Sequence, residues 1–140
     1  GIDDPLGSVY GFLGWESLPS IPELGETPNY SKITLKTLAN LFVALYDAKY
    51  ISIEHSNKIF GYLANTPFND KVDAGVPDDV VVAHKIGVAA AVETFSDCGI
   101  VYAPNRNYLL CLGASGGDEK TAAKFMAEVS AAAYKYVINN

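Results

Sequence analysis

Two neighbouring β-rich segments constrain the fold of this chain more than any other feature of its sequence. Residues 98–103 and 108–114 have the composition of strands, and residues 104–107 between them predict a four-residue hairpin loop. The hairpin is apolar on both faces, with Ile100, Tyr102, Leu109 and Cys111 on one and Val101, Leu110 and Leu112 on the other. A sheet of this kind needs a covering layer on each side.

Helical periodicity elsewhere supplies candidate layers. Three segments carry it: residues 34–47, residues 52–64 and an alanine-rich stretch from residue 118 to about residue 137. Thr34 and Ser52 are suitable N-caps for the first two. Residues 80–86 form a further predicted strand, which ends at Gly87. The sequence thus predicts an α+β fold: a helical pair, then an antiparallel β-meander covered by a long C-terminal helix.

Composition indicates one folded domain. The chain has 140 residues, 49% hydrophobic and 19% charged, which excludes a disordered chain. Residues 1–33 are rich in proline and glycine but also in apolar side chains, so we expect a packed loop region there. A helical part over residues 34–79 and a part with strands and the C-terminal helix over residues 80–140 follow. Because the chain begins at Gly1 rather than at a methionine, we expect a single partial domain.

Charge and residue spacing exclude several classes of function. The net charge is −6 and no basic stripe occurs, so no nucleic-acid partner is expected. No apolar run approaches the roughly 20 residues of a spanning helix, so no membrane span is expected. His55 and His84 are isolated in the sequence, and Cys98 and Cys111 lack zinc-ligand spacing. The sequence therefore predicts no metal site and no cofactor.

The predicted hairpin register also bears on the two cysteines. With a four-residue loop, Ala103 faces Tyr108. Cys98 then faces Gly113, and Cys111 is only its diagonal neighbour. Diagonal side chains on a hairpin lie about 7–8 Å apart, beyond the reach of a disulfide. We therefore expect Cys98 and Cys111 not to be bridged.

Lys85 is the first candidate for chemistry. It lies at the end of an apolar predicted strand, and its ammonium must reach solvent or a counter-charge, because burying an unpaired cation is very unfavourable. Gly87, two residues later, allows another backbone to approach closely. Together these residues could hold an extended ligand with a carboxylate as an added strand. The simpler interpretation is a strand that ends in a solvated lysine and a turn glycine.

The surroundings of Lys85 resemble a known family. Residues 83–87 (Ala-His-Lys-Ile-Gly), residues 97–103 (Asp-Cys-Gly-Ile-Val-Tyr-Ala) and the alanine-rich terminal helix are similar to the C-terminal half of the class A β-lactamase-like and penicillin-binding serine hydrolases. The resemblance covers about residues 30–140. It implies that Lys85 recognises a substrate carboxylate, that Gly87 permits close substrate approach and that the backbone N–H of Val88 stabilises an oxyanion. It also implies an extracytoplasmic location.

The chain also departs from the family pattern. The family forms an acyl-enzyme on the serine of a Ser-x-x-Lys motif, aided by a Ser-x-Asn or Tyr-x-Asn loop, and this sequence contains none of these motifs. Ile86 replaces the usual threonine or serine, which removes a hydroxyl that would bind the substrate carboxylate. Glu16 lies near the position of the loop glutamate that activates the deacylating water in the family's lactamases, and Trp15 beside it could exclude water. A solvated loop acid is the simpler interpretation of Glu16.

Two main functions remain open. The first is the C-terminal portion of a β-lactamase-like serine hydrolase that acts on β-lactams or D-Ala-D-Ala peptides through an acyl-enzyme. Its nucleophile half is missing from this chain, so we expect no acylation of the chain alone by a penicillin. The alternative is a non-catalytic α+β binding or interaction domain of the same ancestry, whose groove at Lys85 holds a peptide, such as a peptidoglycan-type peptide, or a carbohydrate-linked ligand without turnover. An unrelated regulatory domain is a further alternative.

The predicted sheet edge suggests a partner chain. Residues 108–112 form an apolar strand without proline, lysine or other edge protection. The terminal helix covers one face of the sheet, so the other face would lack its cover. We therefore expect the folded species to contain a second chain, either the missing N-terminal half or a second copy of this chain.

Overall fold

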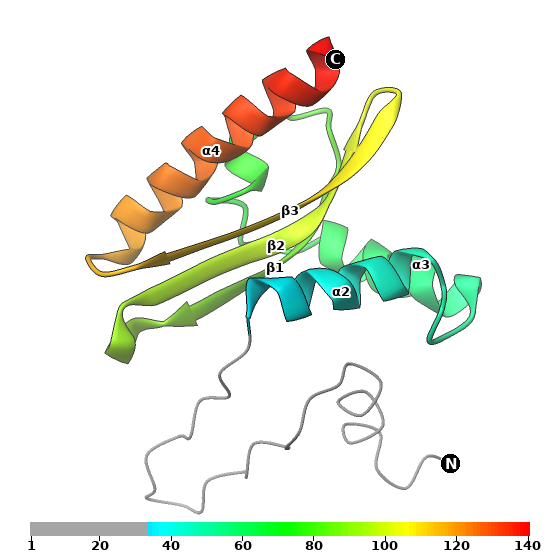
Figure 1. The fold of residues 1–140 in the computed structure, drawn as a ribbon, viewed down its shortest axis with the longest axis horizontal. Helices are drawn as coiled ribbons and strands as arrows, with labels where there is room; N and C mark the ends of the chain where they lie inside the picture. Colours follow the sequence, from blue (N-terminus) through cyan, green and yellow to red (C-terminus); the bar gives the residue numbers. More distant parts are fainter. Residues whose placement is uncertain (1–33) are drawn as a thin grey trace, which may run out of the picture.

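The computed structural model describes residues 34–140, which form an antiparallel three-stranded sheet with helices on both faces (Figure 1). The elements in chain order are α2 (Leu35–Tyr46), α3 (Ile53–Ala64), the 3₁₀ turn η1 (Asp73–Gly75), β1 (Val82–Ala89), the 3₁₀ turn η2 (Ala90–Val92), β2 (Thr94–Ala103), β3 (Arg106–Ser115) and α4 (Glu119–Asn139). The strand order β1-β2-β3 confirms the predicted α+β meander. Residues 1–33, with the predicted packed loop and Glu16, lie outside the described residues. None of the helices within residues 34–140 is long and apolar enough to span a membrane.

The helices begin where their capping residues predict. The side chains of Thr34, Ser52 and Asp118 each accept a hydrogen bond from the backbone N–H three positions later, at 3.1, 3.3 and 2.8 Å. These bonds satisfy N–H groups that a helix leaves unpaired in its first turn. Gly116 and Gly117 have φ angles of 82° and 80°, so the turn before α4 uses a left-handed backbone that glycine adopts readily.

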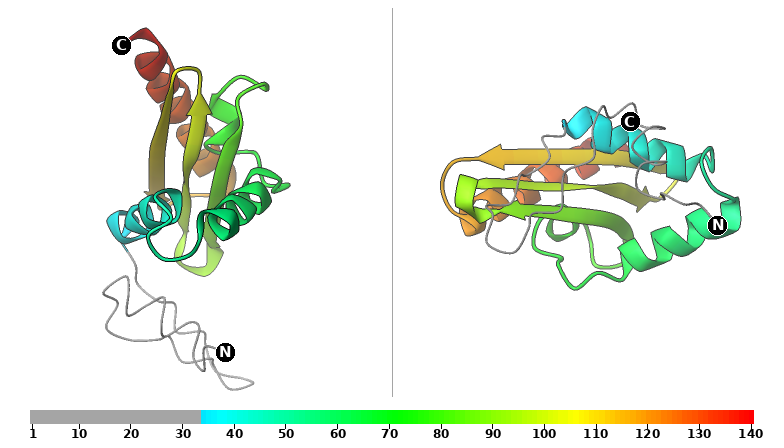
Figure 2. Two further views of the ribbon diagram at one scale, coloured as in Figure 1. Left: turned by 90° about the vertical axis from the view of Figure 1, so that its right-hand side faces the viewer. Right: turned by 90° about the horizontal axis from the view of Figure 1, so that it is seen from below.

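Both faces of the sheet are covered, as Figure 2 shows from two directions. On one face, Met126 of α4 and Phe95 of β2 belong to the same buried cluster. On the other face, Phe42 of α2 and Phe60 of α3 pack with Ile100 of β2. The expectation that one face would lack its cover is therefore wrong, because the predicted helical pair folds back onto the face that α4 leaves open.

Strand β1 continues through Gly87 to Ala89, so the prediction that the strand ends at the glycine is wrong. Gly87 pairs with Ser96 of β2. A Cβ atom at residue 87 would lie 2.5 Å from Ser96 Oγ, so the glycine leaves room for the hydroxyl group of its cross-strand neighbour. Strand β2 correspondingly begins at Thr94, earlier than the predicted start at residue 98.

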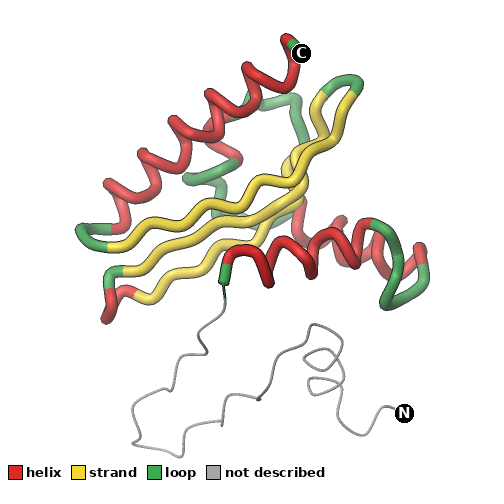
Figure 3. Tube along the Cα trace, viewed as in Figure 1, coloured by secondary structure: helices red, strands yellow, loops and turns green. Residues whose placement is uncertain are grey.

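The hairpin between β2 and β3 turns in two residues, Pro104 and Asn105, because Ala103 pairs directly with Arg106 (Figure 3). Asn105 adopts a φ of 67°, a left-handed conformation that asparagine tolerates better than most residues. The shorter turn changes the predicted register across the whole hairpin.

The cysteines face each other in this register. Cys98 pairs with Cys111, their Cα atoms lie 3.9 Å apart, and a disulfide joins them. The prediction that they are not bridged is therefore wrong, because it rested on a four-residue loop that set Cys98 against Gly113.

Candidate functional site

Strand β1 forms one edge of the sheet, and no strand within residues 34–140 pairs with its outer side (Figure 3). Successive residues of an antiparallel ladder direct their N–H and C=O groups alternately toward the partner strand and away from it. Tyr102 N–H donates to Val81 C=O at 2.9 Å, so the backbone groups of Lys85 face β2 as well. Ile86 and Val88 therefore present their N–H and C=O groups at the outer edge, which is the orientation that the predicted role of Val88 needs.

The side chains of Lys85 and Ser96 lie on one face of the sheet, beside Gly87. Lys85 pairs with Cys98, which belongs to the cluster under α2 and α3, so its side chain projects from that same face. Lys85 is exposed, and its ammonium donates a hydrogen bond to the outward-facing C=O of Ile86 at 2.6 Å. The structure thus places Lys85 and Gly87 within the strand rather than at its end, and the ammonium reaches solvent as predicted.

Ser96 is the member of this group that sequence reasoning missed. Its hydroxyl lies over Gly87, two residue pairs along the ladder from Lys85 and on the same face of the sheet. It could supply a hydroxyl to a carboxylate held by Lys85, in place of the one that Ile86 lacks. The feature that could have identified Ser96 is its pairing with Gly87, which exists only because β2 begins at Thr94 rather than at residue 98.

The groups that residues 34–140 bring together here are suited to binding a ligand. An ammonium, a hydroxyl and outward backbone N–H groups suit a carboxylate on an extended chain. No group of three or more histidine, cysteine, aspartate or glutamate side chains within residues 34–140 could hold a metal ion. The outer edge of β1 is therefore a candidate binding site, and its groups suit an anionic ligand.

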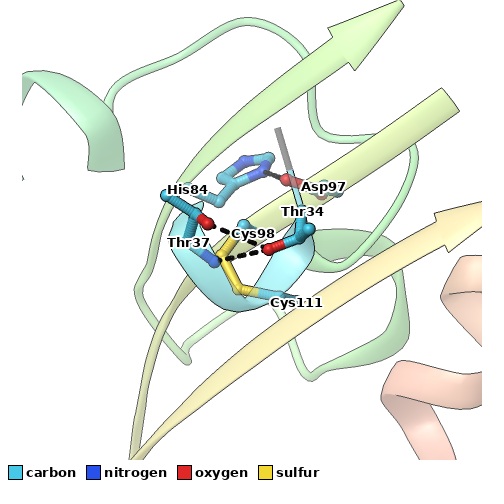
Figure 4. The surroundings of a disulfide bond; sticks show 6 residues. All are labelled: Thr34, Thr37, His84, Asp97, Cys98 and Cys111. Atoms are coloured by element: carbon cyan, nitrogen blue, oxygen red, sulfur yellow. Dashed lines mark hydrogen bonds and ion pairs between the residues drawn. A yellow bond between two sulfur atoms is a disulfide. The ribbon is translucent and has the colours of Figure 1, made fainter. Parts of the chain in front are cut away.

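A buried polar pair lies behind the site, on the α4 side of the sheet. His84 and Asp97 are 1% and 0% exposed, and His84 Nδ1 lies 2.9 and 3.0 Å from the two carboxylate oxygens of Asp97 (Figure 4). Asp97 also accepts the backbone N–H of Val72 at 2.9 Å, and His84 Nε2 lies 3.4 Å from Asn69 Oδ1. Gly99 pairs with His84, and a Cβ there would lie 2.5 Å from His84 Cβ.

Further charged groups tie the loop before β1 to α4. Lys71 is buried, and its ammonium lies 2.9 Å from Asp70 and 3.1 Å from Glu119. Burial disfavours the charged form of Lys71, but the hydrogen bonds to both carboxylates outweigh it and raise the pKa of Lys71 above its ordinary value. Burial raises the pKa of Asp73, and the negative charge of Asp97 adds to this while His84 opposes it.

The chain matches the model of the β-lactamase enzyme family over residues 12–137. A β-lactamase from Sphaerobacter thermophilus shares 18% identity with a TM-score of 0.76, covering 96% of this chain and 53% of that chain. PBP-A shares 17% identity with a TM-score of 0.71, covering 96% of this chain and 51% of that one. A PBP-A variant solved as an acyl-enzyme complex with penicillin G shares 19% identity with a TM-score of 0.66, covering 75% and 40%.

The chain thus spans about half the length of PBP-A and of the Sphaerobacter thermophilus β-lactamase. No curated protein sequence matches it. At these identities the solved structures show a shared fold, whereas the family model covers nearly the whole chain. This chain belongs to the β-lactamase enzyme family.

Proposed function

We propose that this chain forms the carboxylate-binding part of a β-lactamase-type hydrolase that acts on β-lactams or D-Ala-D-Ala peptides through an acyl-enzyme. The observation that carries the proposal is the exposed Lys85 on the free edge of β1, beside Gly87 and the hydroxyl of Ser96. The similarity to a PBP-A variant whose structure is an acyl-enzyme complex with penicillin G supports this ligand class.

Each residue of the site has a role in this proposal. Lys85 binds the substrate carboxylate, and Ser96 donates a hydrogen bond to the same group. Gly87 lets the substrate lie against the strand, and the outward N–H of Val88 stabilises the oxyanion that forms at the attacked carbonyl. Glu16, in the proposed packed loop of residues 1–33, activates the water that releases the acyl group.

The nucleophile comes from outside these 140 residues, because no Ser-x-x-Lys occurs among them. The chain is then one part of a larger domain, completed by an N-terminal half or by a second copy of this chain. No strand within residues 34–140 pairs with the outer side of β3, so such a segment can pair there.

We further propose an extracytoplasmic location. The disulfide between Cys98 and Cys111 supports it, since disulfides form and persist in oxidising compartments.

A titration of the ¹⁵N-labelled chain with penicillin G tests the proposal. We expect amide shifts at residues 85–88 and 96, and about tenfold weaker binding for Lys85→Met. Lys135→Met, on the exposed side of α4, is the matched control and should bind like the unmodified chain. Equal affinity of the two variants would remove Lys85 from the site.

The alternative function, a binding domain without turnover, is favoured by the same free edge of β1, which can accept an extended peptide as a fourth strand. A fluorescent penicillin separates the two. The hydrolase proposal expects covalent label only after the chain is combined with a segment that carries Ser-x-x-Lys. If the fluorescent penicillin binds only reversibly, both to the chain alone and to the chain combined with such a segment, the binding domain is supported.

A further inference from the structure

The His84–Asp97 pair lies directly behind Lys85. Along the ladder, His84 pairs with Gly99, Lys85 with Cys98 and Ile86 with Asp97. The bond from His84 to Asp97 therefore crosses from β1 to β2 diagonally, and the Lys85 pair lies between its two ends. Because side chains alternate, the bond lies on the face opposite the Lys85 side chain.

The bond is anchored from several directions. Asp97 accepts the Val72 N–H at 2.9 Å, and the C=O of Val72 accepts the hydroxyl of Ser130 on α4 at 2.7 Å. The groups in this network are buried, so each bond is sheltered from competing water. The edge strand β1, whose outer side has no partner among the described strands, is thereby tied at residue 84 to β2 and, through the loop, to α4.

We propose that His84 is a positioning residue for Lys85. Its bond to Asp97 fixes the twist and the height of β1 at the Lys85 pair, and so holds the Lys85 ammonium at the outer edge beside Ile86 C=O. An edge strand held by backbone bonds on one side alone would sample a wider range of positions at this point. The positioning role concerns Lys85 itself, and its effect on ligand binding rests on the proposed function.

A purely stabilising role makes a different prediction. Any buried bond of this network would then affect Lys85 in proportion to its effect on stability. Ser130→Ala provides the matched control, because it removes a buried hydrogen bond of the same network on the α4 side, away from β1.

The test is NMR of the chain with ¹³C-labelled lysine, at a temperature where every variant is folded by circular dichroism. We expect His84→Leu to shift and broaden the Lys85 ¹³Cε signal, and His84→Asn, whose amide can donate near the position of Nδ1, to restore most of it. Ser130→Ala, which removes the bond farthest from His84 in this network, should change the Lys85 signal much less than His84→Leu does. No variant should change the signal of Lys135.

Asp97→Asn keeps the imidazole ring, so a shift in this variant does not arise from loss of the ring current. It also serves if His84→Leu fails to fold. An unchanged Lys85 signal in Asp97→Asn, or an equal change in Ser130→Ala, overturns the positioning role.

Penicillin G binding distinguishes this inference from the proposed function. His84→Leu should weaken binding about fivefold in the unmodified chain and leave it unchanged in the Lys85→Met background, since coupled residues are not additive. If the NMR signal responds but penicillin G does not bind at all, the positioning role stands and the proposed ligand class fails. An equal loss in both backgrounds shows that His84 does not act through Lys85.

Discussion

His84 and Lys85 are neighbours in the sequence, yet the two faces of β1 give them opposite environments. His84 is buried and bonded to Asp97, whereas Lys85 is exposed and reaches the free edge of the strand. The face toward α4 holds the strand with buried polar bonds. On the opposite face, which α2 and α3 cover in part, Lys85 is exposed and Gly87 and Ser96 are partly exposed. An edge strand can thus keep polar groups exposed on one side while its other side is bonded into the core.

The largest expected effect on stability concerns the closed face, by which we mean the α4 side of the sheet, where His84 bonds Asp97. Asp97→Ala removes the acceptor of both His84 and the Val72 N–H, so we expect the free energy of unfolding to fall by about 3–5 kcal/mol. Urea unfolding measures this loss. Asp79→Ala, at an exposed position in the loop that precedes β1 and contains Val72, should change the free energy of unfolding by less than about 0.5 kcal/mol. A loss below about 1 kcal/mol for Asp97→Ala would mean that the buried bonds do not hold this face.

The disulfide contributes to stability on the other face of the sheet, the one that α2 and α3 cover. The bonded cysteines are 13 residues apart, and opening a loop of about this length should lower the free energy of unfolding by about 3 kcal/mol. Intact mass should rise by two hydrogens on reduction. A Cys98→Ser/Cys111→Ser variant should be insensitive to reductant. An unchanged mass on reduction contradicts the bridge.

Lys71 gives the closed face a dependence on pH. Its pKa is raised in the folded state, so the folded chain binds this proton more tightly than the unfolded chain does. The stability from Lys71 is therefore fully present below its ordinary pKa of 10.5 and is lost as pH rises through the raised value. We expect Lys71→Met to lose about 1 kcal/mol at neutral pH and to show a weaker decline in alkali. If the free energy of unfolding falls equally with rising pH in Lys71→Met and in the unmodified chain, Lys71 is not the cause of the decline.

The smallest effect on stability is expected at the exposed Lys85. Lys85→Met should change the free energy of unfolding by less than about 0.5 kcal/mol, because the ammonium is exposed and bonded only to the neighbouring C=O of Ile86. Thermal unfolding checks this, alongside the tenfold loss of penicillin G affinity already expected. A stability loss near that of Asp97→Ala would erase the difference between the two faces.

The local elements of this fold are predictable because local residues determine them. Thr34 and Ser52 mark the starts of their helices through bonds within a single turn. Asn105, by contrast, adopts the left-handed conformation that shortens the hairpin, and the composition of residues 104–107 allows either loop length. One such residue decides whether Cys98 meets Cys111 or Gly113.

The candidate site is predictable only in part. Lys85, Gly87 and Val88 follow from one short segment and the family it resembles. Ser96 requires the register between two strands, and that register is a property of the folded sheet. The buried Lys71 depends on Glu119, which lies 48 residues away, so a sequence pattern at Lys71 suggests only a solvated cation.

The bridged hairpin has a consequence for how this chain can be cut and labelled. Cys98 and Cys111 flank the turn at Pro104 and Asn105, so the hairpin tip belongs to a closed covalent ring. A protease that nicks the exposed turn would leave both strands joined through sulfur, and the two fragments would separate only after reduction. New chain ends, or an inserted reporter peptide, can therefore be placed at this tip without freeing either strand from its partner.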